Sequence, residues 1–484
     1  MKYILSDEYL LRGWQKLPYA VLNKETKEVR FPSKEAFLFI MKCDGRTEIE
    51  EPQDEKLKLF IADLLDNDVI RPAKRTDFLS VEQLYYQYPC RYKRNVQWSI
   101  TGGCNLRCKH CFMSAPDAKH GNPTHEELMD IVSQLAECGV FEVGLTGGEP
   151  LIRKDFWQIV DALTEKGIYI DAIYTNGLLV NEKFVEEYKK RGLLAGVQMS
   201  YDGVGVHDWL RGIEGTEEAV RRAFVLLHEN GIRTSASMCL HRKNVHTIRE
   251  TVNWLAANGV RSLKINRSQE VGEWEKQDID IRLTLAETVK AYADYIPQFF
   301  ADDAPLNLVL DGSFSFDKEY EEAYVSYIRP CPAEREKTKL SCPSLAQGFY
   351  IGAEGMVAPC MMMADHPFSE RFPNLHTIPL REILGDSELM KLSQTKVADV
   401  RNGNDECRKC PYLDKCSGGC RQAALVTSSN YYGPERTVCE FFKHGWDEMI
   451  QQVMEQPYKD YLKRNNIKPK EINKDDLEEK MRDC

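Results

Sequence analysis

The chain of 484 residues is longer than one typical hydrophobic core, so two or three domains are expected. Hydrophobic residues make up 43% and charged residues 29%, which is typical of a soluble globular protein, and no run of eighteen apolar residues is present to span a membrane. The formal net charge of −11 disfavours a broad nucleic-acid surface, because phosphate binding needs clustered lysine and arginine. The first residues lack the pattern of a signal peptide, so we expect the protein in the cytoplasm, where sixteen cysteines indicate metal clusters rather than disulfides.

Residues 1–90 are predicted to form a small module of a β-hairpin and helices. Two apolar stretches, Tyr19–Leu22 and Val29–Phe31, flank a polar turn and predict the hairpin. One helix is expected to begin at Ser33, and a second, with apolar residues at helical spacing, follows from Asp54.

The order of these elements resembles a small winged-helix domain. In particular, it is similar to the recognition element of enzymes that modify ribosomally made peptides, which captures a leader peptide as an added strand at the hairpin edge. A DNA-binding winged helix and a merely structural cap are the alternatives. With 14 lysines and arginines against 16 aspartates and glutamates, residues 1–90 carry a net charge of −2, which counts against DNA.

Residues 91–270 alternate short apolar runs with helical stretches. The runs are Val96–Thr101, Phe141–Leu145, Ile168–Tyr174, Ala195–Tyr201, Thr234–Leu240 and Ser262–Ile265. Thr124 and Glu127 predict a capping box, and Gly139, Gly167, Gly231 and Gly259 stand where helices should end. Six strands alternating with helices predict an α/β fold with a parallel sheet.

A cysteine triplet directly follows the first of these runs. The stretch WSITGGCNLRCKHCF places Cys104, Cys108 and Cys111 as C-x3-C-x2-C. A cubane iron–sulfur cluster normally takes four thiolates, so a triplet suggests one iron left open for a small molecule. The alternatives are unrelated thiols or a structural zinc site, which His110 and His120 could complete.

The spacing of the triplet resembles the radical S-adenosylmethionine (SAM) superfamily. The resemblance implies a partial (β/α)6 barrel and a 4Fe–4S cluster whose open iron chelates the amino and carboxylate groups of SAM. It also implies SAM contacts at the strand ends, where parallel barrels place their sites. These contacts are Gly147, Gly148 and Glu149 of the GGEP segment, Ser200, Asp202, Arg211, His110 against the adenine, and Ser237 as a further candidate. For Asp202 an Asx-type turn before Gly203 is the alternative.

Residues 271–330 are expected to be a connector. Asp278–Phe300 is helix-like, Leu306–Leu310 is strand-like, and a stretch rich in phenylalanine and tyrosine runs to Tyr327. These aromatic residues could line a peptide groove, although such residues more often belong to the core.

Residues 331–445 contain a second cysteine array. Cys342 precedes Gly355 and Cys360, Cys407–Cys420 has the form C-x2-C-x5-C-x3-C, and Cys439 closes the series. This order resembles the seven-cysteine SPASM extension of radical SAM enzymes that modify peptides. A zinc ribbon would use four of the cysteines and leave the others unexplained.

The SPASM resemblance implies two auxiliary 4Fe–4S clusters. The outer cluster would be held by Cys407, Cys410, Cys416 and Cys439. The inner cluster would be held by Cys342, Cys360 and Cys420, with Cys331 as fourth ligand. Alternatively, one inner iron stays free to bind a substrate thiolate.

Some residues match no motif. Cys138 and Cys239 are expected to be buried and to behave as small apolar residues. In residues 446–484 a brief helical face is expected to be interrupted by Pro457 and to give way to a charged tail that ends at Cys484.

Together these resemblances imply a cytoplasmic radical SAM/SPASM maturase of a ribosomally made precursor peptide, recognised through its leader by residues 1–90. The implied cofactors are SAM and three 4Fe–4S clusters, one binding SAM and two auxiliary. The implied partners are the peptide and an electron donor such as flavodoxin or ferredoxin, with no nucleic acid and no membrane.

The expected reaction abstracts a hydrogen from an unactivated peptide carbon and forms a cross-link, with a cysteine-to-carbon thioether favoured. The alternatives are a carbon–carbon cross-link, epimerisation at an α-carbon, and a sulfatase-maturating type that makes formylglycine. A metal-dependent winged-helix regulator is the alternative outside enzymes.

Overall fold

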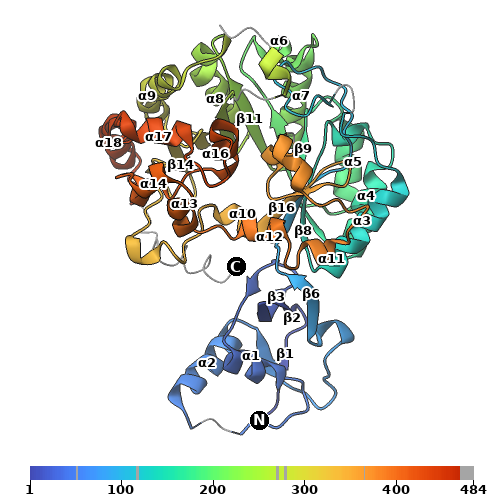
Figure 1. Ribbon diagram of the computed structural model, residues 1–484. Coiled ribbons are helices and arrows are strands. Elements are labelled where there is room, and N and C mark those ends of the chain that lie inside the picture. The colour runs from blue at the N-terminus through green and yellow to red at the C-terminus, as the bar shows by residue number, and fades with distance from the viewer. Residues whose placement is uncertain (51–52, 116–118, 269–271, 277–280, 365, 469–484) are drawn as a thin grey trace.

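The computed structural model describes residues 1–50, 53–115, 119–268, 272–276, 281–364 and 366–468. Figure 1 shows a large body built around a curved sheet, with the first ninety residues projecting from one side of it. None of the helices in the described part of the chain is long and apolar enough to cross a membrane.

The large body is organised by an eleven-stranded sheet in the order β15-β14-β13-β12-β11-β10-β9-β8-β7-β16-β17. Strands β7 to β13 pair in parallel with one another and β16 pairs in parallel with β7, whereas β14, β15 and β17 join the sheet antiparallel. The bounds are β7 (Asn95–Ser99), β8 (Glu142–Thr146), β9 (Tyr169–Thr175), β10 (Gly196–Ser200), β11 (Thr234–Leu240), β12 (Ser262–Arg267), β13 (Asn307–Leu310), β14 (Phe314–Asp317), β15 (Glu322–Tyr324), β16 (Gly348–Ile351) and β17 (Val357–Ala358). The six predicted strands are confirmed as β7 to β12, and the expected strand at Leu306–Leu310 is β13.

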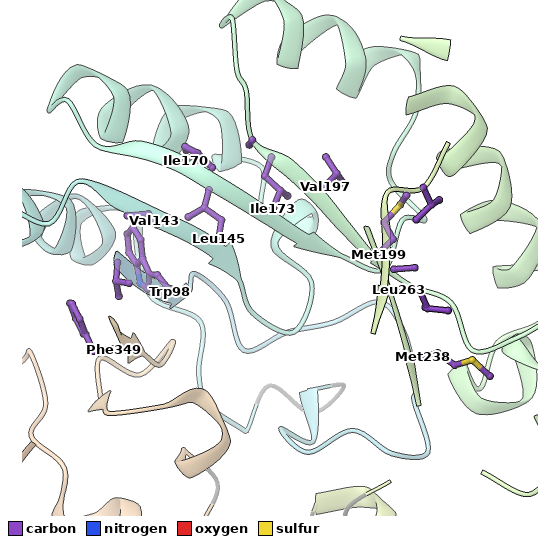
Figure 2. Close-up of a cluster of buried hydrophobic side chains, with 14 of the residues drawn as sticks. Trp98, Val143, Leu145, Ile170, Ile173, Val197, Met199, Met238, Leu263 and Phe349 are labelled. Atoms are coloured by element: carbon purple, nitrogen blue, oxygen red, sulfur yellow. The ribbon is translucent and has the colours of Figure 1, made fainter. Parts of the chain in front are cut away.

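Helices follow the parallel strands and bury one face of the sheet. They are α3 (His125–Glu137), α4 (Phe156–Glu165), α5 (Glu182–Lys190), α6 (His207–Arg211), α7 (Thr216–Glu229), α8 (Ile248–Ala257) and α9 (Leu285–Ala301). The capping box is confirmed, because Thr124 Oγ1 accepts from Glu127 N at 3.2 Å and Glu127 Oε2 accepts from Thr124 N at 2.7 Å. Figure 2 shows part of the core of the sheet, including Val143 and Leu145 of β8 and Ile170 and Ile173 of β9.

The C-terminal third covers the open side of the sheet (Figure 1) and extends it through β16. Its helices are α10 (Pro343–Gln347), α11 (Leu380–Ile383), α12 (Glu388–Ser393), α13 (Val397–Gly403), α14 (Asp405–Arg408), α15 (Leu413–Cys416), α16 (Arg421–Ser428), α17 (Arg436–Lys443) and α18 (Trp446–Arg464).

Two predictions about helices were wrong, one about where a helix begins and one about an interruption by proline. Helix α9 begins at Leu285 behind a capping box of Thr284 and Glu287, later than the predicted Asp278, which lies outside the described residues. Helix α18 continues through Pro457, because the packing of its buried Ile450 and Tyr461 offsets the hydrogen bond that proline removes. Cys484 lies outside the described residues.

The N-terminal module contains a four-stranded sheet in the order β4-β3-β2-β6 and a separate β1–β5 pair. Its elements are β1 (Tyr3–Leu5), β2 (Tyr9–Gln15), β3 (Leu17–Asn23), β4 (Val29–Arg30), α1 (Lys34–Met41), α2 (Glu55–Asp66), β5 (Ile70–Pro72) and β6 (Tyr86–Arg91). The hairpin is confirmed as β3–β4, and Ser33 and Asp54 cap the two predicted helices. The winged-helix assignment stays a prediction.

The module shares a core with the large body. Trp14 of β2 is fully buried, its ring stacks on Tyr88 at 5.0 Å, and its Nε1 donates to Cys138 O at 3.0 Å. On the other face of the same sheet, Leu11 and Val21 pack into a second core with helices α1 and α2. The sheet is therefore held between its own helices and the large body.

The linker after β6 is tied to the C-terminal third by a buried lysine. Lys93 is 0% exposed, and its Nζ donates to Leu345 O at 2.5 Å and to Ala346 O at 2.9 Å. Burial lowers the pKa of Lys93 to about 7. Because these carbonyls belong to α10, which starts directly after Cys342, the lysine fixes the segment that presents this cysteine.

Replacing Trp14 tests the shared core. Trp14→Ala is expected to weaken the docking of the module by about 3–5 kcal/mol through the lost packing. Trp14→Phe, which keeps a ring but loses the hydrogen bond, is expected to cost about 1–3 kcal/mol. Amide hydrogen exchange in β2 and β3 measures both, and wild-type exchange in the alanine variant would contradict the shared core.

Replacing Lys93 tests the tether. Lys93→Met leaves two buried carbonyls without a donor, which is expected to cost at least about 2 kcal/mol, or roughly 30-fold faster opening of α10 and β16 in hydrogen exchange. The control is Lys154→Met, since Lys154 is exposed. Equal hydrogen exchange of α10 and β16 in the two variants would contradict a role of Lys93 in fixing this segment.

Candidate functional site

The cysteine triplet lies on the loop after β7, and the loops of two other elements hold it. Gly148 N donates to Thr101 O at 2.8 Å and Glu149 N donates to Gly103 O at 2.9 Å. A Cβ at Gly148 would lie 2.2 Å from Gly103 O. The glycines of the GGEP segment thus allow it to lie against the cysteine loop itself. On the opposite side, Lys109 N donates to the carbonyl of Leu210 in α6 at 2.9 Å.

The three thiols receive donors that suit thiolates. Cys104 Sγ accepts from Leu106 N and Cys111 Sγ from Ala115 N, both at 3.4 Å, and Arg211 Nη1 lies 3.6 Å from Cys108 Sγ. Such hydrogen bonds to sulfur tune iron–sulfur clusters. Burial raises the pKa of Cys104 to about 12, so a metal must replace the proton before the thiolate forms. Three thiols with these donors fit a cluster held by three cysteines.

The carboxylate of Glu149 is fully buried and accepts hydrogen bonds from groups of the protein itself. It accepts from Leu151 N at 3.1 Å, from Thr175 Oγ1 at 2.8 Å and from Asn176 N at 2.7 Å. Burial raises its pKa to about 7. Glu149 therefore joins the loops after β8 and β9, and the backbone of its loop is the part left to meet a ligand.

Asp202 and Arg211 form a buried ion pair beside the triplet. Arg211 Nε donates to Asp202 Oδ2 at 2.6 Å, and Asp202 Oδ1 accepts from Cys239 N at 3.0 Å. Burial acts to raise the pKa of Asp202, but the Arg211 guanidinium and a hydrogen bond from His207 hold it well below its usual range. The partners of the carboxylate come from β11 and α6, not from the turn that an Asx motif would use.

Ser200, the last residue of β10, lies opposite Ser237 in the middle of β11. Ser237 Oγ accepts from Asn266 Nδ2 at 3.0 Å, whereas Ser200 is half-buried. The expected polar contacts of the fourth and fifth strands are thus adjacent.

Three rings near the triplet bear nitrogens without partners. The ring of Trp274 lies 6.2 Å from that of His110 and 6.3 Å from that of His241. His241 Nδ1 accepts from Lys243 N at 3.1 Å, so its proton is on Nε2. Within the described residues His241 Nε2, Trp274 Nε1 and His110 Nδ1 are buried without a hydrogen-bond partner.

Buried polar atoms are normally satisfied, so this group of nitrogens marks a place for the polar atoms of a ligand. Burial lowers the pKa of His110 to about 3, which keeps its ring neutral. Sequence reasoning found His110 but missed His241 and Trp274. Their position just beyond the fifth and sixth strands was the signal that could have found them.

The C-terminal cysteines form two groups. Burial and the neighbouring thiols of Cys407, Cys416 and Cys410 raise the pKa of Cys439 to about 12. Burial and the thiols of Cys420 and Cys342 raise the pKa of Cys360 to about 11. The structure thus brings together the four cysteines of the expected outer cluster and, separately, the three of the inner one.

Cys331 lies beside the outer group. It is buried in a small core with Cys407, Leu413 and Cys416, and its backbone N donates to Asp414 O at 2.7 Å. Within the inner group, Cys420 is exposed and Cys342 and Cys360 are half-buried.

Two family models match the chain. The radical SAM superfamily matches residues 98–255, and the SPASM model, an iron–sulfur cluster-binding domain, matches residues 342–411. These ranges contain the cysteine triplet and four cysteines of the second array, Cys342, Cys360, Cys407 and Cys410.

Relatives share this architecture. Fe-coproporphyrin III synthase from Methanosarcina barkeri is 25% identical over 78% of this chain and 95% of its own length. Mycofactocin maturase MftC from Mycobacterium tuberculosis is 24% identical over 70% of this chain and 81% of its own length. The crystal structure of Streptococcus suis SuiB bound to precursor peptide SuiA has a TM-score of 0.63 at 16% identity, covering 90% of this chain and all of SuiB.

The cofactors of these two domains are SAM and iron–sulfur clusters, and the thiols and buried donors described above fit both. The chain therefore combines a radical SAM domain over residues 98–255 with a SPASM iron–sulfur cluster-binding domain over residues 342–411.

Proposed function

We propose that the protein is a maturase that modifies a ribosomally made precursor peptide. One observation carries this proposal: the SuiB fold covers 90% of this chain, more than residues 91–484 alone could supply, so part of the N-terminal module is matched as well. SuiB is described as bound to a precursor peptide, and MftC is named a maturase. The similarity to a coproporphyrin enzyme covers 78% of this chain, a share that residues 91–484 alone could supply.

The site residues take the following roles in this proposal. Cys104, Cys108 and Cys111 hold the first cluster, and the backbone of Gly147 to Glu149 meets the amino group of SAM. Ser200 and the Asp202–Arg211 pair face the ribose and carboxylate, and Arg211 also donates toward Cys108. The unpartnered nitrogens of His110, His241 and Trp274 lie beside the adenine.

When bound, the first cluster and SAM supply a 5′-deoxyadenosyl radical that removes a hydrogen atom from the substrate. The protein must hold the peptide carbon close and keep water out. Burial of Asp202, Glu149 and Trp274 supports a site that excludes water. Electrons would come from a small redox protein such as flavodoxin or ferredoxin.

The N-terminal module is proposed to bind the leader at the free edge of β4. Asn23 N donates to Glu28 O at 2.9 Å, and Val21 stands opposite Arg30. Since hydrogen-bonded pairs alternate along an antiparallel ladder, the N–H and C=O of Val29 face away from β3. They are open to an added strand, the mode in which many extended peptides bind.

A thioether between a cysteine and a carbon is the favoured product. Cys342, Cys360 and Cys420 would give the inner auxiliary cluster three thiolates, and Cys331 packs instead beside Cys407, so one inner iron is left for a substrate group. Such a cluster could position a substrate thiol and accept the surplus electron. A carbon–carbon cross-link or epimerisation would share the same first step.

The function is tested by anaerobic reaction of the protein with SAM, a reductant and the precursor peptide encoded beside its gene. Loss of two hydrogens in mass spectrometry is expected for the wild type. Val29→Pro, which removes the edge N–H, is expected to raise KM at least about tenfold with little change in kcat, because leader binding is uniform binding. Val29→Thr keeps the N–H and is the matched control.

Point variants are preferable to deleting residues 1–90, since deletion would uncover the core around Trp14. An unchanged peptide mass with deuterium uptake from solvent would indicate that the reaction is epimerisation and not cross-linking. No change in any peptide by a protein with intact clusters would contradict the maturase.

The ligands of the inner cluster are tested by metal content. We expect about twelve irons with matching sulfide per chain, from three four-iron clusters. Because Cys331 packs beside Cys407 and Cys416, Cys331→Ala should keep all of this iron, whereas Cys342→Ala should lose about four irons. Loss of one cluster in both variants would instead make Cys331 the fourth ligand.

A further inference from the structure

Arg421 is a buried arginine without a carboxylate partner. Its side chain is 1% exposed, and among the other arginines in the described residues only Arg211 is also buried. Arg211 is paired with Asp202, whereas no carboxylate of the described residues forms an ion pair with Arg421. Because arginine keeps its proton in proteins, an uncompensated positive charge lies inside the C-terminal third.

The guanidinium of Arg421 is held by backbone carbonyls. Nη1 donates to Tyr431 O and to Gly433 O, each at 3.0 Å, and Nη2 donates to Gly418 O. Nε is buried and has no acceptor in the part of the chain that the structure describes. These neutral acceptors fix the position of the guanidinium without compensating its charge, and Nε is left to donate to another group.

Arg421 lies between the two C-terminal cysteine groups. It directly follows Cys420 of the inner group, and its acceptor Gly418 belongs to the loop that joins Cys420 to Cys416 of the outer group. Burial raises the pKa of the Cys407 thiol in the outer group, and the Arg421 charge opposes this rise. The guanidinium therefore acts on thiols of both groups.

The nearby carboxylate of Glu435 does not neutralise Arg421. Its two oxygens accept from Thr437 N and Val438 N, each at 3.0 Å, and it forms no ion pair with Arg421 within the described residues. A buried charge is costly unless an opposite charge compensates it. Thiolates that bind iron carry negative charge, so the unused donor and the charge of Arg421 fit the two iron–sulfur sites beside it.

We propose that Arg421 is a fixed positive charge that makes the auxiliary clusters better electron acceptors than the first cluster. A 4Fe–4S cluster that takes up one electron gains one negative charge, which a nearby buried cation stabilises. At the first triplet Arg211 also lies beside a thiol, but Asp202 neutralises it. Arg421 thus raises the reduction potential of the auxiliary clusters alone. This inference goes beyond the proposed function, because it holds for any substrate that gives up an electron.

The test is an anaerobic redox titration of the iron-loaded full chain with dithionite, followed by electron paramagnetic resonance. Because SAM binds to the first cluster, the signals that SAM leaves unchanged belong to the auxiliary clusters. Arg421→Gln removes the charge. At the wild-type midpoint potential, its ratio of reduced to oxidised auxiliary cluster should fall at least about tenfold, a shift of about 59 mV to lower potential for one electron. The first cluster should keep its wild-type potential.

Two further variants separate the charge from the hydrogen bonds. Arg421→Lys keeps the charge but loses the planar fork that binds the carbonyls, so its auxiliary potential should stay closer to wild type than that of Arg421→Gln. Arg233→Gln is the matched control. Arg233 also donates to a carbonyl, Leu194 O at 2.6 Å, but it is exposed and lies at the amino end of β11, away from the cysteine loops. All cluster potentials should be unchanged in this variant.

A wild-type auxiliary potential in Arg421→Gln with full iron would overturn the inference. So would an equal shift, or an equal loss of iron, in the glutamine and lysine variants, because Arg421 would then act through its hydrogen bonds alone. Loss of iron in the glutamine variant only would support the inference, since lysine retains the charge. The measurement needs no peptide, so its failure would leave the proposed maturase untouched.

Discussion

The parallel pairing of β7 to β13 is the constraint on which the rest of the molecule depends. Parallel strands with crossover helices bring all their carboxyl ends to one edge, so loops far apart in the chain meet there. The cysteine triplet, the GGEP segment and the Asp202–Arg211 pair belong to three different loops. None of these groups is close to the others in sequence, and the register of the sheet alone makes them neighbours.

The buried polar groups fall into two kinds. Asp202, Glu149 and Lys93 form hydrogen bonds to other parts of the chain, and each joins segments that would otherwise separate. The nitrogens of His241 and Trp274 are buried without partners. The hydrogen-bonded groups keep the site rigid. Because an unpaired buried donor is costly, the nitrogens of His241 and Trp274 indicate where a ligand binds.

The sequence predicted the repeated strands and helices well, because their signals are local. The capping box at Thr124, the helix caps at Ser33 and Asp54 and the six apolar runs depend on residues a few positions apart. The cysteine motifs predicted both iron–sulfur domains for the same reason, since the spacing of thiols along one loop is fixed by the cluster.

What the sequence could not predict depends on contacts between distant residues. Pro457 looked like a helix end, but α18 packs along α9, with the ring of Tyr461 against that of Phe300. Cys239 looked like a small core residue, yet it lies half-exposed on the inner face of the sheet. Cys331 was assigned to the inner cluster by its place in the order of cysteines, and only the fold places it beside Cys407.

The pairing of β16 with β7 has a consequence for biosynthesis. Strand β7, which leads into the cysteine triplet, gains its second neighbour only when residues 348–351 have left the ribosome, some 250 residues later. Until then one edge of β7 is an unpaired template for foreign strands. The sheet that frames the first cluster is therefore closed late, by the same C-terminal third that supplies the second cysteine array, which favours insertion of both sets of clusters after the whole chain is made.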